Sequence, residues 1–167
     1  MNESFAKTEI PSNTFRDYLL AVVPHMQRTA GEYERVGRFD SITAVKELRL
    51  ITVDAGRQTG KTTGVKQFAL THAKNTGQQI LHLDWYTKEA NYARSNGKDE
   101  PFVFSPSNIS SRIDPKKIID HFLNHKYVVL ILTGSLMWHA AIVDELCVRY
   151  RNEPREFDQN FIVILDK

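Results

Sequence analysis

Short apolar runs alternate along the chain with segments whose apolar residues recur at helical spacing. The apolar runs at 48–53, 80–83, 127–132 and 161–165 predict four β-strands. Between them, 62–74, a segment from 115 onward and 138–150 place apolar side chains three and four positions apart, which predicts α-helices. Strands that are apolar throughout must be covered on both sides. The pattern therefore indicates an α/β fold with a mainly parallel sheet and helices on both faces.

Capping and breaking residues set the limits of these elements. Asp114-Pro115 is a typical helix start, and Gly77 follows the segment 62–74 as a helix stop. The polar stretch 86–111 interrupts the alternation, and a short helix is expected within it at 88–94.

The loop after the first predicted strand carries the most specific motif in the chain. It reads Ala55-Gly56-Arg57-Gln58-Thr59-Gly60-Lys61-Thr62-Thr63. From Gly60 onward it matches the P-loop pattern G-x-x-x-x-G-K-[ST], with Ala55 in place of the first glycine. Its position between a predicted strand and a predicted helix is the one that phosphate binding requires. The sequence therefore predicts a three-layer P-loop NTPase fold that binds ATP with Mg²⁺.

Each residue type in this loop has a chemical role. Backbone N–H groups from Gln58 to Lys61 are expected to surround a β-phosphate, and Gly60 to adopt a geometry that larger residues resist. Lys61 is expected to reach the β- and γ-phosphates, and the Thr62 hydroxyl to coordinate Mg²⁺. The loop from Ala55 to Thr63 is thus the predicted nucleotide site.

Hydrolysis also needs an acid at the end of a neighbouring strand, where it holds Mg²⁺ through water. The third predicted strand is followed by Thr133-Gly134 and offers no acid. Asp84 ends the second strand, and we assign it as the metal-binding and catalytic acid, although it could equally be a residue that starts the next turn.

Two other places compete with Asp84 for this role. Asp166 ends the fourth strand, but a terminal solvated carboxylate explains it slightly better. Asp144-Glu145 follows an apolar run, yet an amphipathic helix in which Glu145 pairs with Arg149 is the better interpretation. ATP binding is therefore better supported than ATP hydrolysis.

The first 47 residues are expected to form a helical segment that packs on the core, and residues 48–167 the P-loop nucleotide-binding domain. The apolar face of the helical segment consists of Phe15, Tyr18, Leu19 and Val22. Among the histidines, His82 lies inside a strand and is expected to be packed and hydrogen-bonded.

The stretch from Gly56 to Thr63 resembles the Walker A loop of tailed-phage terminase large subunits, which are DNA-packaging motors. Arg57 and Gln58 match the Arg-Gln pair of that family, in which this arginine is implicated in catalysis. The resemblance further implies that Gln27 contacts adenine and that 88–94 is the helix after the second strand. It covers Gln27 to Arg94, and no nuclease domain or clear Asp-Glu strand end accompanies it.

A second resemblance is to the partition and septum-site ATPases. Gly60-Lys61-Thr62-Thr63, Gly77 and the run Leu81–Asp84 reproduce the spacing of that family from the P-loop to the second-strand acid. The signature lysine of the family would fall at Gly56, so its dimer contact is missing.

Composition limits the remaining possibilities. The chain has 22 Lys+Arg against 20 Asp+Glu, a balance that permits nucleic-acid contact without requiring it. Its single cysteine excludes an internal disulfide and a Cys-rich zinc site. The N-terminus does not resemble a signal peptide, and no apolar run is long enough for a membrane helix. A cytoplasmic location is expected, in the host cytoplasm if the protein is viral.

We therefore expect a Mg²⁺-dependent ATP-binding protein, an ATPase of the nucleic-acid-handling, viral packaging-like type. Its expected partners are the nucleotide and either DNA or a protein that supplies missing catalytic groups, and an oligomer is compatible with this. One alternative is a nucleotide-switched binding module with little or no hydrolysis. Another is a small-molecule or nucleoside kinase that uses Asp84 as its base and 86–111 as a substrate lid.

Overall fold

The residues that the structure describes contain one sheet in which all neighbouring strands run parallel. This computed structural model describes residues 12–37, 40–55, 60–84, 103–104, 114–134 and 136–167. The strand order is β1-β5-β4-β2-β3. The strands are β1 (Leu50–Val53), β2 (Ile80–Asp84), β3 (Val103–Phe104), β4 (Val129–Thr133) and β5 (Ile162–Asp166). The predicted α/β class with a parallel sheet is confirmed, although the sequence pattern does not predict β3.

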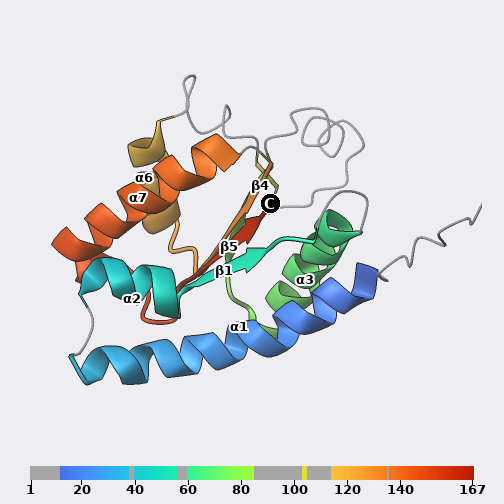
Figure 1. Cartoon of the computed structure of the whole chain (residues 1–167), viewed down its shortest axis with the longest axis horizontal. Coiled ribbons are helices and arrows are strands. Elements are labelled where there is room, and N and C mark those ends of the chain that lie inside the picture. Colours follow the sequence, from blue (N-terminus) through green and yellow to red (C-terminus); the bar gives the residue numbers. More distant parts are fainter. Residues whose placement is uncertain (1–11, 38–39, 56–59, 85–102, 105–113, 135) are drawn as a thin grey trace, which may run out of the picture.

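Helices cover both faces of this sheet (Figure 1). One face carries α1 (Ser12–Arg35) and α3 (Lys61–Thr76). The other carries α2 (Ser41–Leu48), α6 (Pro115–Asn124) and α7 (Leu136–Asn152). A 3-10 turn, Pro154–Glu156, follows α7. The helices predicted at 62–74, from 115 and at 138–150 are confirmed as α3, α6 and α7, whereas 88–94 lies outside the described residues.

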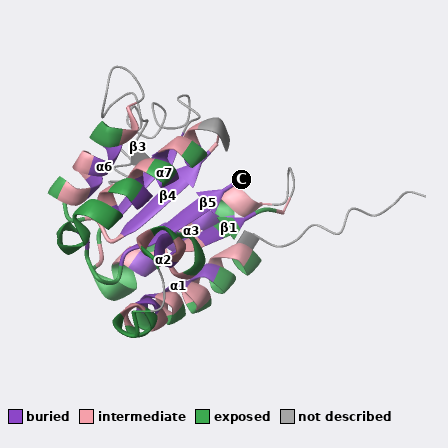
Figure 2. Cartoon of the chain, turned by 60° about the vertical axis from the view of Figure 1, so that its left-hand side comes forward, coloured by how far each residue is buried: buried purple, intermediate pink, exposed green. Residues whose placement is uncertain are grey.

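Alternation along each strand decides which helices its side chains contact. Ile80, Ile131 and Ile164 belong to the apolar cluster with α1 and α3, and their neighbours Leu81, Leu132 and Leu165 to the cluster with α6 and α7. Every residue of β2, β4 and β5 is buried (Figure 2). A polar side chain in these strands therefore needs a partner inside the protein.

Some element limits differ from the sequence prediction by one or two residues. Leu48 belongs to α2 rather than to the first strand, because Asp40 starts a helix that runs through to this residue. The Asp40 Oδ1 accepts hydrogen bonds from the backbone N–H groups of Ile42 (3.0 Å) and Thr43 (2.9 Å). The third strand begins at Val129 and the fourth at Ile162, each ending one residue later than predicted.

The long helix α1 packs mainly against α3. Leu19 and Val23 are completely buried in the cluster with the sheet, and Phe15 and Val22 are partly buried against it. The prediction that Tyr18 belongs to the apolar face packed on the core is wrong, because Tyr18 is 51% exposed. The buried stripe of α1 runs through Leu19 and Val23, four residues apart, and Tyr18 lies beside it.

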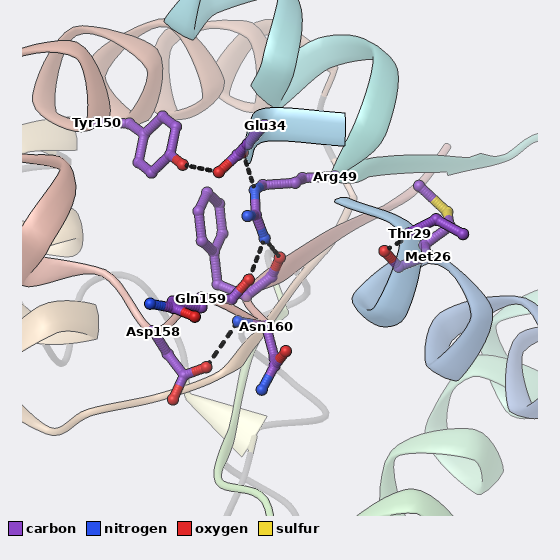
Figure 3. A network of polar contacts seen from close by, with 9 residues as sticks. Met26, Thr29, Glu34, Arg49, Tyr150, Asp158, Gln159 and Asn160 are labelled. Atoms are coloured by element: carbon purple, nitrogen blue, oxygen red, sulfur yellow. Dashed lines mark hydrogen bonds and ion pairs between the residues drawn. The ribbon is translucent and has the colours of Figure 1, made fainter. Parts of the chain in front are cut away.

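A buried arginine joins both helical layers at the amino ends of β1 and β5 (Figure 3). Arg49 Nε donates to Glu34 Oε1 of α1 at 2.9 Å. Its Nη1 donates to the backbone oxygens of Gln159 (2.8 Å) and Phe161 (3.0 Å), just before β5. The hydroxyl of Tyr150 in α7 donates to the other Glu34 oxygen at 2.7 Å. This network ties α1, α7 and the start of β5 to the residue that precedes β1.

We expect Arg49→Met to lower the free energy of unfolding by about 2–4 kcal/mol, because it leaves Glu34, the buried Phe161 carbonyl and the part-buried Gln159 carbonyl without their charged donor. Urea denaturation measures this change. The exposed Arg35 on α1 offers a matched control, and Arg35→Met should change stability by less than about 0.5 kcal/mol. Equal effects of the two substitutions would show that the network contributes nothing.

Two glycines allow a test of backbone strain without side-chain contacts. Gly77 ends α3 with φ +69°, Gly31 lies inside α1, and an added Cβ would meet nothing within 4 Å at either position. Gly77→Ala should destabilise by about 1–2 kcal/mol, since a left-handed conformation strains alanine. Gly31→Ala should stabilise by about 0.5–1 kcal/mol through its higher helix propensity. Thermal melts that shift in the same direction would contradict this account.

Candidate functional site

The P-loop motif enters the described structure at Gly60, directly before α3. Gly60 has φ +74°, so the expectation that this position needs a glycine is confirmed. β1 ends at Val53 and α3 begins at Lys61, which confirms the predicted order of strand, loop and helix. Residues 56–59, which include Arg57, lie outside the described part of the chain, and their phosphate contacts stay a prediction.

Polar residues occupy the last position of three neighbouring strands. Asp84 of β2 is in register with Thr133 of β4, and Thr133 with Asp166 of β5. Alternation places all three on the sheet face covered by α3, because Ile131 and Ile164, two positions earlier in β4 and β5, belong to that cluster. Each is at most 2% exposed. We call Asp84, Thr133 and Asp166 the edge row; it lies at the carboxyl ends of the strands.

The first turn of α3 meets the edge row at Asp166. Lys61 Nζ lies 3.5 Å from Asp166 Oδ1, and the two side chains are 11% and 1% exposed. Burial raises the pKa of Asp166, while hydrogen bonds from Thr62 and Thr133 and the charge of Lys61 oppose that increase. Lys61 and Thr62 are the two described motif residues whose side chains have a predicted role. Both act on the Asp166 carboxylate, Lys61 through its charge and Thr62 through its hydroxyl.

A second ion pair lies two strands away from the first. Lys66 Nζ is 3.7 Å from Asp84 Oδ2, and Asp84 is completely buried. The predicted acid Asp84 therefore lies on the same sheet edge as Asp166, with Lys66 rather than Lys61 as its charge partner. Sequence reasoning missed Lys66, although its spacing of four from Thr62 places both residues on one face of a helix.

The strand residue His82 completes this polar group. Its Nε2 lies 2.8 Å from Thr133 Oγ1, and the Thr133 hydroxyl donates to Asp166 Oδ2 at 3.3 Å. The prediction that His82 is packed and hydrogen-bonded is confirmed. Burial, with a smaller contribution from Lys66, lowers the pKa of His82 to about 3. The sequence pattern shows Thr133 only as a non-acidic residue at the end of its strand. In the structure it is the residue that joins His82 to Asp166.

The remaining candidates lie elsewhere. Asp144 and Glu145 are inside α7, which confirms the helical interpretation, and Asp144 pairs with Lys46 at 3.5 Å. The sequence predicts an ion pair between Glu145 and Arg149. In the structure Arg149 pairs instead with Asp120, Glu153 and Glu156.

Gln27 is separated from the P-loop by the length of the sheet. Its Nε2 donates to Gln78 Oε1 and to the Asn160 backbone oxygen, both at 3.0 Å. Gln78 and Asn160 precede β2 and β5, so Gln27 lies at the amino ends of the strands, opposite Lys61. The structure therefore places Gln27 at the end of the sheet opposite Lys61, and its contact with adenine stays a prediction.

The oxygen atoms around Asp166 suit Mg²⁺ better than they suit a metal ion that takes all its ligands from the protein. Within the described ranges, no group of three or more His, Cys, Asp or Glu side chains could hold a metal ion. Mg²⁺ commonly takes one or two protein oxygens and completes its shell with water and substrate phosphates. The Thr62 hydroxyl, which helps to lower the pKa of Asp166, and the Asp166 carboxylate could supply such oxygens.

Comparisons with known proteins leave the site as the main guide to function. No family model matches this chain, and neither a curated protein nor a solved structure matches it. Among the helices that the structure describes, none combines the length and apolar character that a membrane crossing requires.

Two buried histidines predict how stability depends on pH. Burial, and secondarily Lys167, lowers the pKa of His139 to about 4, against about 3 for His82 and 6.5 in the unfolded chain. Between these values the unfolded state binds more protons than the folded state. The free energy of unfolding should therefore be highest above pH 6.5 and decrease as the pH falls towards 4.

Urea denaturation at several pH values between 7 and 4 measures this slope. Because the raised pKa of Asp166 acts in the opposite direction, the informative comparison is with His139→Asn, which should remove up to about one proton from the slope. An unchanged slope would mean that folding does not lower the pKa of His139.

Proposed function

We propose that the carboxyl edge of β1 and β5 is a Mg²⁺-dependent ATP site in a three-layer P-loop fold. The observation that carries the proposal is the meeting of Lys61, Thr62 and Asp166, since the motif residues and an acid from the adjacent strand converge at one helix N-terminus. In open parallel sheets, ligands bind outside the carboxyl ends of the strands, which supports the same location.

Each side chain would have a defined task. The free N–H groups of the first turn of α3 would bind phosphate oxygens, and Lys61 would leave Asp166 to contact the terminal phosphates. Thr62 and Asp166 would hold Mg²⁺, which neutralises phosphate charge when bound. We favour Asp166 over Asp84 as the acid, because Asp166 is paired with Lys61 of the motif whereas Asp84 is paired with Lys66.

The class of activity is a proposal that rests on the loop sequence. The Arg57-Gln58 pair resembles that of the packaging motors and supports an ATPase that handles nucleic acid. Such an ATPase would act in the cytoplasm, which is the host cytoplasm if the protein is viral. A partner protein or DNA would then stimulate turnover.

Binding of ATP to purified variants tests the site. Lys61→Ala should weaken Mg²⁺-ATP binding about 10- to 100-fold, because it removes a charge-assisted contact to phosphate. Lys74→Ala, an exposed lysine in the last turn of the same helix, should bind normally. Thermal melts confirm that both variants are folded. Unchanged ATP affinity in Lys61→Ala would exclude this site.

Phosphate release, measured with and without DNA, then separates the possible activities. Asp166→Asn should retain ATP binding without Mg²⁺ and reduce Mg²⁺-dependent release by about 100-fold or more. Stimulation by DNA supports the nucleic-acid-handling ATPase. Tight binding without release would instead indicate a nucleotide-switched module, and transfer to a small acceptor would indicate a kinase.

A further inference from the structure

His82 and Thr133 form a chain of hydrogen bonds that leads to the proposed phosphate site. His82 Nε2 lies 2.8 Å from Thr133 Oγ1, which lies 3.3 Å from Asp166 Oδ2. The other Asp166 oxygen, Oδ1, faces Lys61 Nζ at 3.5 Å. All three residues of the chain are at most 2% exposed, so water does not replace these contacts.

The number of protons in this chain fixes its direction. A hydroxyl donates one hydrogen bond, and an ionised carboxylate only accepts. With the Thr133 proton directed to Asp166, the hydroxyl oxygen offers only lone pairs to His82. A neutral imidazole must then present Nε2–H rather than Nδ1–H. The charged groups beside the chain are Lys61 and Lys66 of α3 and Asp84 of β2.

We propose that His82 is a positioning residue for Asp166, acting through the Thr133 hydroxyl. By donating from Nε2, His82 keeps the hydroxyl proton directed at Asp166 Oδ2 and leaves Oδ1 turned towards Lys61. Its effect on ATP turnover rests on the proposed function, whereas the direction of the hydrogen bonds does not. His82 thus reaches Asp166 through Thr133 rather than by a direct hydrogen bond.

Side-chain ¹⁵N NMR of the full chain at neutral pH tests the direction, because protonated and unprotonated ring nitrogens differ in chemical shift. The expected result in the unsubstituted protein is the Nε2–H form of His82. An Nδ1–H form would overturn the proposal at this first step, before any variant is needed.

Asp166→Asn provides the sharper test, because it should reverse the chain. Lys61 is a donor only, so the new amide should keep its oxygen towards Lys61 and present its N–H₂ group to Thr133. The hydroxyl then accepts from residue 166 and donates to His82, which must change to the Nδ1–H form. Persistence of Nε2–H in a folded Asp166→Asn variant would contradict the proposal.

Thr133→Val is the matched control, since it removes the bridging hydroxyl and keeps the shape. On this background, Asp166→Asn should no longer change the His82 tautomer. A tautomer change that survives the loss of the hydroxyl would show that the coupling does not pass through Thr133.

Turnover of Mg²⁺-ATP separates positioning from a merely structural role. His82→Leu should lower kcat about tenfold with KM within about threefold, because no side chain then keeps the Thr133 hydroxyl proton directed at Asp166. His82→Gln places an amide N–H near the position of Nε2 and should retain most of kcat. Equal losses in both variants would overturn the positioning role. If the unsubstituted protein binds no ATP, the proposed function fails, while the NMR result still decides the direction of the chain.

Discussion

Burial of the sheet on both faces is the constraint on which the rest of the structure depends. Because β2, β4 and β5 expose no residue, a polar side chain on these strands must find its partner within the protein. Apart from His82 inside β2, such side chains lie where the strands end, and α3 supplies lysines to two of them, Asp166 and Asp84. The candidate site is thus a region in which the core changes from apolar to polar under the first turns of one helix.

Most of the elements and the turn at Gly60 could be predicted from the sequence, because they depend on neighbours close in the chain. Strands reveal themselves by continuous apolar residues, and α3 by its spacing and by Gly77. The geometry of Gly60 follows from the motif alone, since few other residues tolerate a positive φ. The burial of His82 was also predictable, because it interrupts an apolar strand.

The sequence could not show which acid, Asp84 or Asp166, lies beside Lys61, because this depends on the order of the strands in the sheet. Asp84 follows the P-loop in sequence, but β5 and β4 lie between its strand and β1, so Asp166 meets Lys61 instead. Gln27 illustrates the same limit: the helix that carries it could be predicted, but not the end of the sheet on which it would lie. The burial of Arg49 likewise depends on Glu34, Tyr150 and Phe161, which no local pattern connects to it.

The position of β1 has a consequence for how the protein comes to fold. Within the described sheet β1 pairs only with β5, and Arg49 contacts Phe161 across 112 positions of chain. Among the described strands, β1 therefore has no partner during synthesis until β5 has left the ribosome. Such long-range pairing slows folding and favours a single late step over gradual growth. A ribosome-bound chain that stops before β5 should consequently hold the whole P-loop motif without the strand that joins β1 to the rest of the sheet.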